Sequence, residues 1–162
     1  MMDVSLKQIR IRQAKLADLA DLVGLLHLLF SIEEDFDFDA DRQHRGLAMM
    51  LERDGAVILV AEAESRVIGM CTGQRMISTA EGGYSLLVED VVVGERWRGR
   101  GVGAGLLKGL EERAKEMRVS RFQLLADRSN NGGLRFYQKQ NWQKTELICL
   151  RKHLPTGNRS EE

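Results

Sequence analysis

The spacing of apolar positions in the first third of the chain is that of helices. Leucines recur at helical intervals over residues 16–30, and a second helix is predicted over about residues 41–53 with its apolar side chains on one face. A short alternating stretch at residues 9–12 predicts a strand ahead of them. Two helices therefore precede most of the strands and must bury their apolar faces against a sheet formed later in the chain.

Beyond residue 54 the period shortens to that of strands. Strands are predicted at residues 56–62, 67–77, 84–93, 121–126 and 142–151, and helices at residues 102–117 and 130–140. The strand at 84–93 ends in consecutive valines, which is typical of a strand buried on both faces. The pattern predicts one α/β domain with a mixed sheet over residues 1–154, followed by a polar tail over 155–162.

Composition narrows the class of protein. The chain has 162 residues, enough for one domain with a core, and its 24 basic and 24 acidic residues cancel. The neutral balance argues against nucleic acid or an anionic membrane as a partner. The two cysteines and three histidines show no metal-ligand spacing, so no metal is expected. No apolar run spans a bilayer and no signal-peptide pattern is present, which predicts a cytoplasmic protein.

A glycine-rich turn joins the valine-rich strand to the helix predicted at residues 102–117. Residues 93–105 read VGERWRGRGVGAG. Glycine lets the backbone approach a bulky ligand, and the unpaired N–H groups of a helix's first turn attract phosphates. The segment therefore predicts a pyrophosphate cradle.

Three interpretations of this turn can be compared. A Walker loop requires Gly-Lys-Ser/Thr, which is absent. Gly99-x-Gly101-x-x-Ala104 fits the Rossmann glycine spacing, but it lies past mid-chain and has no acidic residue about 20 positions on, where Ser120 stands. A turn without a ligand is disfavoured, because each glycine at a helix start is costly unless its backbone is used.

The remaining interpretation rests on a family resemblance. Arg98-x-x-Gly101-x-Gly103 resembles the acyl-CoA signature of the GNAT (GCN5-related N-acetyltransferase) superfamily, which is Arg/Gln-x-x-Gly-x-Gly/Ala. A second block, NNGGLRFY at residues 130–137 followed by Asn141 and Trp142, is similar to the family's Asn-x-x-Ala-x-x-Phe-Tyr…Gly-Phe ending. Gly133 replaces the family's alanine. Asn141 replaces its glycine, a change that a left-handed helix cap tolerates.

The resemblance implies a single-domain GNAT fold. Its mostly antiparallel mixed sheet has splayed central parallel strands and is flanked by helices. The implied co-substrate is acetyl-CoA, whose pantetheine arm would pair with the backbone of Val91 and Val93. Dimerisation is common in the family, and nothing in the sequence decides it for this chain. The residues that the resemblance assigns to acetyl-CoA are Val91, Val92, Val93, Arg98, Gly99, Arg100, Gly101, Val102, Gly103, Ala104, Asn130, Phe136 and Tyr137.

Acetyl transfer by direct attack requires a base for the amine and an acid for the leaving thiolate. The resemblance makes Tyr137 the acid, Glu89 the base and Asp90 a substrate contact. Alternation along the strand is expected to send Glu89 and Asp90 to opposite faces unless a bulge intervenes. The competing interpretations are a tyrosine that only packs beneath CoA and carboxylates that only pair with arginines at a sheet edge.

The acidic connector, defined as residues 32–41, is the remaining clue to the acceptor. In the family fold this segment lines the acceptor side, which implies that Glu33, Glu34 and Phe36 contact substrate. Clustered carboxylates favour a small cationic amine such as a polyamine, a lysine side chain or an aminoglycoside. A solvated loop is the competing interpretation. The sequence also leaves open a protein lysine or N-terminus as acceptor, and an acyl-CoA-binding regulatory module without turnover.

Overall fold

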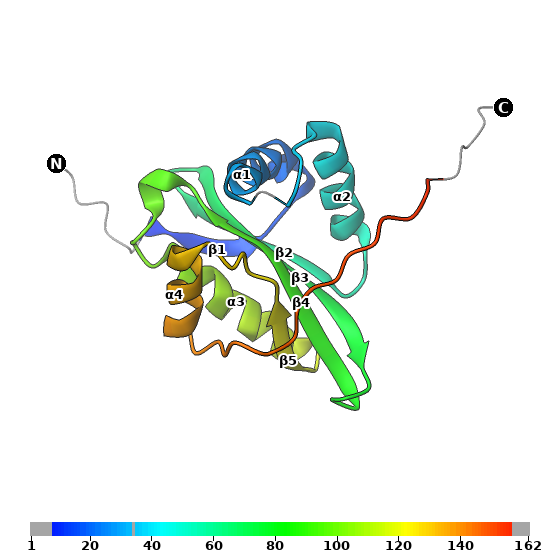
Figure 1. Ribbon diagram of the computed structural model, residues 1–162. Helices are drawn as coiled ribbons and strands as arrows, with labels where there is room; N and C mark the ends of the chain where they lie inside the picture. The colour runs from blue at the N-terminus through cyan, green and yellow to red at the C-terminus, as the bar shows by residue number, and fades with distance from the viewer. Residues whose placement is uncertain (1–7, 34, 157–162) are drawn as a thin grey trace. The chain divides into compact units, whose positions relative to one another are not determined.

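A five-stranded sheet organises most of the chain (Figure 1). The computed structural model describes residues 8–33 and 35–156, and the chain divides into two compact units after Asp127. The elements of the first unit are β1 (Arg10–Gln13), the 3-10 helix η2 (Leu16–Asp18), α1 (Leu19–Ile32), α2 (Ala40–Glu52), β2 (Ala56–Ala63), β3 (Arg66–Ser78), β4 (Gly83–Val93), the 3-10 helix η3 (Glu95–Trp97), α3 (Val102–Glu116) and β5 (Val119–Leu124). These bounds confirm the predicted elements of this unit to within a few residues.

The order of strands in the sheet follows the chain. β1 to β4 pair antiparallel, and β5 lies parallel to β4 at the end of the sheet. The β4–β5 ladder stops at Val88 and Leu124, so that residues 89–93 of β4 run on without a partner in β5. The predicted mixed sheet with splayed parallel strands is confirmed.

Helices cover both faces of this sheet: α1 and α2 on one side and α3 on the other (Figure 1). Leu22 and Leu26 of α1 share a buried cluster with Met70 of β3 and Val92 of β4. On the α3 side, a Cβ added at Gly73 would lie 2.7 Å from Leu86 Cδ2 of β4 and 3.3 Å from Leu110 Cδ1 of α3, so these leucines fill the space above the glycine. The apolar faces of the helices and the sheet thus form two layers of core around the strands.

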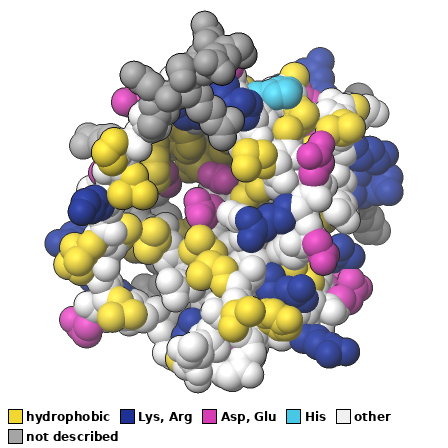
Figure 2. Space-filling model, turned by 90° about the vertical axis from the view of Figure 1, so that its right-hand side faces the viewer, with side chains coloured by type: hydrophobic (Ala, Val, Ile, Leu, Met, Phe, Trp, Pro, Cys, Tyr) yellow, Lys and Arg dark blue, Asp and Glu magenta, His cyan; other side chains and the backbone are white. Residues whose placement is uncertain are grey.

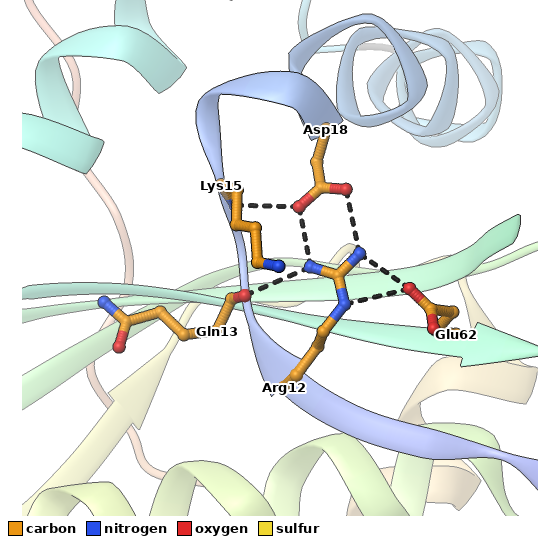
Figure 3. A network of polar contacts seen from close by, with 5 residues as sticks. All are labelled: Arg12, Gln13, Lys15, Asp18 and Glu62. Atoms are coloured by element: carbon orange, nitrogen blue, oxygen red, sulfur yellow. Dashed lines mark hydrogen bonds and ion pairs between the residues drawn. The ribbon is translucent and has the colours of Figure 1, made fainter. Parts of the chain in front are cut away.

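An ion-pair network fixes β1 to the start of α1 (Figure 3). The Arg12 guanidinium donates to both carboxylate oxygens of Asp18, at 2.8 and 2.9 Å, and to Glu62 Oε2 at 2.8 Å. Asp18 also accepts from the Lys15 backbone N–H at 2.7 Å. The Arg12 and Asp18 side chains are only 14% and 9% exposed. Since burying an ion pair demands that its hydrogen bonds be satisfied, this network specifies how the chain turns from strand to helix.

The second unit contains α4 (Asn131–Lys139). Asn130 caps it, because its side chain accepts a 3.0 Å hydrogen bond from the Gly133 N–H. At its other end Asn141 has φ +67°, which confirms the left-handed cap expected there.

One predicted element of the second unit is wrong. Residues 142–151 form no strand in the part of the chain that the structure describes, and Leu147 and Leu150 are exposed. A continuous apolar run becomes a strand only where a neighbouring strand pairs with it, and the local pattern does not encode that partner. No helix among the described residues is long and apolar enough to cross a membrane.

Candidate active site

A β-bulge interrupts β4 at Asp90. Opposite β3, Met70 pairs with Val92 whereas Thr72 pairs with Glu89, so β4 holds one extra residue in this interval. Asp90 has φ +52°, in the left-handed region that aspartate tolerates better than most residues. The Thr72 hydroxyl donates to Asp90 Oδ2 at 3.1 Å. The bulge and this hydrogen bond turn the Asp90 side chain toward the face covered by α1 and α2.

The bulge overturns the expectation that Glu89 and Asp90 face opposite sides of the sheet. Both side chains line one pocket, because the extra residue breaks the alternation of the strand. Neither carboxylate forms an ion pair with an arginine among the described residues. An adjacent acidic pair that lines a pocket is a candidate functional site.

The pocket has a volume of about 580 Å³ and lies between α1, α2 and the middle of β3 and β4. Pockets of this size accommodate small molecules. Figure 2 shows acidic, basic and hydrophobic side chains intermixed on the face that carries α2. The residues that line the pocket are Leu26, Phe30, Arg42, Gln43, Gly46, Leu47, Met49, Met50, Glu52, Arg53, Gln74, Glu89 and Asp90.

The electrostatics of the pocket centre on Asp90. Burial, and to a smaller extent the charge of Glu89, raise the pKa of Asp90 to about 6, and the hydrogen bond from Thr72 opposes this rise. Burial also raises the pKa of Glu33, with Asp90 and Asp127 as the largest charge contributions. Asp90 and Glu33 therefore lie in a region of low solvation, where the charges of nearby carboxylates disfavour their ionisation.

Asp127 was missed by the analysis of the sequence. It follows β5 by three residues, and its charge acts on Glu33 together with that of Asp90. The carboxyl ends of neighbouring parallel strands meet at one edge of a sheet, so the strand order would have identified this position. Sequence reasoning also overlooked Gln74, Arg42 and Arg53, because helix and strand residues of this kind carry no motif.

The acidic connector is attached to α1 by aromatic contacts. Phe36 packs on Phe30 with ring centroids 5.4 Å apart, and Phe38 stacks on His27 at 4.2 Å. Phe30 lines the pocket, whereas Phe36 is 43% exposed and is not among the lining residues. Glu33 lies close enough to Asp90 for their charges to interact, and Glu34 is outside the described residues.

Beyond the bulge, the edge of β4 that faces away from β3 is available for a ligand. Gly94 N–H donates to Ile68 O at 2.8 Å, so alternation turns the N–H and C=O of Val93, and likewise of Val91, away from β3. The β5 ladder has ended by this point. The Val93 carbonyl accepts from Arg98 Nε at 3.1 Å, while the Val92 side chain is buried in the core. Strand-like pairing to an extended ligand has a place here.

The glycine-rich turn leads directly into α3. Gly99 and Gly101 have φ +71° and +80°, and a Cβ on either would meet nothing within 4 Å. Gly101 is the N-cap of α3, no acidic residue occupies the first helical turn, and no side chain caps it. The N–H groups of Val102, Gly103 and Ala104 therefore form an open, electropositive helix start suited to a phosphate.

Two arginines of this turn have structural contacts. Arg98 ties the turn to the end of β4 through the Val93 carbonyl, and the Arg100 guanidinium lies 5.4 Å from the centre of the Trp97 ring. Both side chains are exposed. These contacts stabilise the conformation of the turn. The contribution of Arg98 and Arg100 to cofactor binding stays a prediction.

The second unit holds the remaining predicted site residues. The Tyr137 ring packs on Phe136 at 5.2 Å and against Trp142 at 5.8 Å, and Trp142 N–H donates to Tyr137 O at 3.0 Å. The Asn130 side chain is the cap of α4. Each of these contacts lies within the unit, and the assignments of Tyr137, Phe136 and Asn130 to cofactor binding or catalysis stay predictions.

The described residues contain no group of three or more His, Cys, Asp or Glu side chains that could hold a metal ion.

Solved structures with this fold are numerous. A possible acetyltransferase from Clostridium difficile 630 is 18% identical, with 92% of this chain and 99% of that one covered and a TM-score of 0.79. The aminoglycoside acetyltransferase meta-AAC0020 from an uncultured soil metagenomic sample, in complex with trehalose, is 18% identical, with 93% and 99% covered and a TM-score of 0.75. A predicted acetyltransferase with acetyl-CoA from Clostridium acetobutylicum is 21% identical, with 88% and 96% covered and a TM-score of 0.72.

At these identities the similarity concerns the fold. No curated protein matches the sequence. The model of the acetyltransferase (GNAT) family matches residues 22–142, which include the bulge, the open edge of β4, the glycine-rich turn and α4. The chain belongs to the GNAT family of acetyltransferases.

Proposed function

We propose that this protein transfers the acetyl group of acetyl-CoA to the primary amine of a small molecule. One observation carries the proposal: the bulge at Asp90 brings two carboxylates to one pocket immediately before the open edge of β4. Acetyl-CoA would bind along that edge, with its pyrophosphate at the start of α3. The acceptor would enter the pocket on the α1 and α2 side.

The carboxylates of β4 supply the base. At neutral pH the acceptor is an ammonium ion, which Glu89 and Asp90 attract and one of them deprotonates. The exposed Glu89 is our first assignment for the base, with Asp90 as the contact to the ammonium group. Because a base works best with a pKa near the working pH, the pKa of about 6 favours Asp90 as a second candidate for the same step.

The transfer itself needs no covalent intermediate on the protein. The neutral amine attacks the thioester carbonyl, the C–N bond forms, and the C–S bond breaks. The Tyr137 phenol, an O–H donor, gives its proton to the departing thiolate. The nitrogen of the new amide then loses its extra proton, and this proton restores the Tyr137 phenol. The proposed products are an N-acetylated amine and the free thiol of CoA.

Relatives support an amine acceptor in general terms. One protein of the same fold is named an aminoglycoside acetyltransferase, and another was solved with acetyl-CoA. The acidic residues near the pocket support an acceptor that enters with a positive charge.

A panel of primary amines tests this proposal when release of the CoA thiol is followed over time. We expect at least one amine to release thiol above the rate of acetyl-CoA hydrolysis. A protein that binds acetyl-CoA but releases thiol with no amine in the panel, including a lysine peptide, would instead be a non-catalytic acyl-CoA-binding module.

A further inference from the structure

The pocket contains basic groups that a purely cationic acceptor does not require. Arg42 and Arg53 both line it, together with the uncharged Gln43 and Gln74 and with Glu52, the neighbour of Arg53. Neither arginine forms an ion pair within the described residues. Acidic and basic side chains are interspersed on this face of the molecule (Figure 2). A pocket of mixed charge favours a ligand of mixed charge.

The arginines lie at opposite ends of one helical stripe. Residues 42, 46, 49, 50 and 53 follow the spacing of a single face of α2, and all of them line the pocket. At about 1.5 Å of rise per residue, Arg42 and Arg53 are separated by about 16 Å along the helix. A small anion therefore contacts one of them and not both.

The environment of each arginine decides which one is available. Around Arg42 a carboxylate already lies close: Asp39 Oδ1 accepts from the Arg42 backbone N–H at 3.0 Å, and the Asp39 backbone N–H donates to Gln43 Oε1 at 2.7 Å. The neighbouring positive charge of Arg42 also helps to lower the pKa of Asp39. The end of the pocket at Arg53 is different, because Gln74 there is half-buried and its side chain has no hydrogen bond among the described residues.

The register of the sheet sets the distance from this end to the carboxylates. Ala56 N–H donates to Arg53 O at 3.3 Å, and Ala56 pairs with Gln74 on β3. Gln74 pairs with Leu87 and Thr72 with Glu89, so Gln74 and Glu89 are diagonal neighbours across β3 and β4. Diagonal neighbours lie roughly 7 to 8 Å apart. A short molecule can therefore reach from Gln74 to the β4 carboxylates, and Arg53 lines the same pocket beside Gln74.

We propose that the acceptor is a short zwitterion, in which Glu89 and Asp90 hold the ammonium group while Arg53 and Gln74 bind a carboxylate or phosphate at the other end. This proposal rests on the proposed function and narrows its substrate class, in place of the polycation that the acidic connector suggested. A guanidinium beside a side-chain amide matches the several acceptor oxygens of either anion. Amines that lack the anionic group leave Arg53 and Gln74 without a ligand.

The test uses ω-amino acids of increasing chain length and O-phosphoethanolamine, each compared with a matched neutral partner. The partners are the corresponding carboxamides and ethanolamine, and spermidine represents the polycations. Release of CoA thiol is measured for the wild-type protein. We expect at least one anionic amine to exceed both its neutral partner and spermidine in kcat/KM by about tenfold or more.

Variants locate the anion site. Arg53→Gln is expected to lower kcat/KM for the preferred zwitterion about tenfold or more, mainly through KM, and to leave its neutral partner unchanged. Arg45→Gln makes the same charge change on α2 at a residue outside the pocket. It should leave kcat/KM unchanged for both the zwitterion and its neutral partner. An Arg53 that only stabilises the end of the helix would change the melting temperature and not this selectivity.

Three results would overturn the proposal while sparing the proposed function. The first is that spermidine or neutral amines are the best acceptors. The second is that Arg53→Gln lowers kcat/KM equally for a zwitterion and its neutral partner. The third is that only Arg42→Gln lowers kcat/KM selectively for the zwitterion. Absence of thiol release with every amine would instead reject the proposed function itself.

Discussion

The Thr72 hydroxyl of β3 donates a hydrogen bond of 3.1 Å to Asp90 Oδ2 at the bulge of the neighbouring strand β4. This contact holds a left-handed aspartate with its carboxylate in the pocket, beside Glu89. It partly offsets the effect of burial, which together with the charge of Glu89 raises the pKa of Asp90 to about 6. The Asp90 carboxyl group therefore changes between its neutral and charged forms near pH 6.

The first prediction concerns the pH dependence of activity. A carboxylate that accepts a proton or holds an ammonium ion acts only when ionised, so kcat/KM should fall as the pH drops through about 6. Asp90→Asn should remove this step together with most of the activity. A pH–rate profile from pH 5 to 8 checks the expectation, and a flat wild-type profile across that interval would contradict it.

The same group makes a prediction about stability. The pKa of Asp90 is raised above its ordinary value of 3.8, so its contribution to stability is full below that value and is lost as the pH rises through about 6. Asp90→Asn keeps the shape of the side chain and its left-handed backbone while avoiding a buried charge. We expect the melting temperature at pH 7 to rise by several degrees, with no such gain at pH 4. Glu111→Gln, at an exposed residue of α3, is the control and should change neither value.

For the ion-pair network around Arg12 we expect the opposite dependence of stability on pH. Hydrogen bonds from Arg12 lower the pKa of Asp18, so this contribution to stability is present above the ordinary value of 3.8 and is lost as the pH falls through the lower folded value. Asp18→Asn leaves the Arg12 charge without its main partner and should cost about 3 to 5 kcal/mol at neutral pH. Urea unfolding measures this loss. Glu116→Gln breaks the exposed pair with Arg113 and should cost less than about 1 kcal/mol.

The phosphate cradle is tested by Gly101→Glu. Gly101 caps α3 at φ +80°, and a glutamate there adds backbone strain, bulk and negative charge where the pyrophosphate is expected. The stabilisation by acetyl-CoA, seen as a rise in melting temperature, should disappear. Gly82→Glu is a matched control, because Gly82 also has positive φ with open space around it but lies in the β3–β4 hairpin. A shift that survives in Gly101→Glu would place the pyrophosphate elsewhere.

Tyr137→Phe separates packing from proton transfer. The ring contacts with Phe136 and Trp142 need no hydroxyl, so the variant should stay folded and keep its affinity for acetyl-CoA. If the phenol protonates the thiolate, kcat falls at least about a hundredfold. Tyr84→Phe, in the hairpin and beneath Arg75, should have full activity. Unchanged turnover in Tyr137→Phe would leave the ring as a packing residue.

Much of this fold is predictable because its signals are local. The leucine spacing of α1, the valines of β4 and the glycines before α3 each specify an element within one stretch of chain. The strand expected at residues 142–151 fails for the complementary reason, since a strand exists only through its pairing with another.

The site is less predictable than the fold. Glu89 and Asp90 were found as charges in an apolar strand, but one inserted residue decides whether they face the same side, and no local pattern announces it. Asp127 lies near them because β5 runs parallel to β4, and Arg53 with Gln74 because of the order of strands. These relationships are non-local, so they emerge only once the sheet is assembled.

Simultaneous measurement of the N-acetylated amine and the CoA thiol, for the wild-type protein and for the double variant Glu89→Gln/Asp90→Asn, tests the central claim most directly. The account predicts equal amounts of the two products from the wild-type protein, and loss of both in the variant while acetyl-CoA still raises its melting temperature. Thiol release without an acetylated amine, or full activity in the double variant, would contradict it.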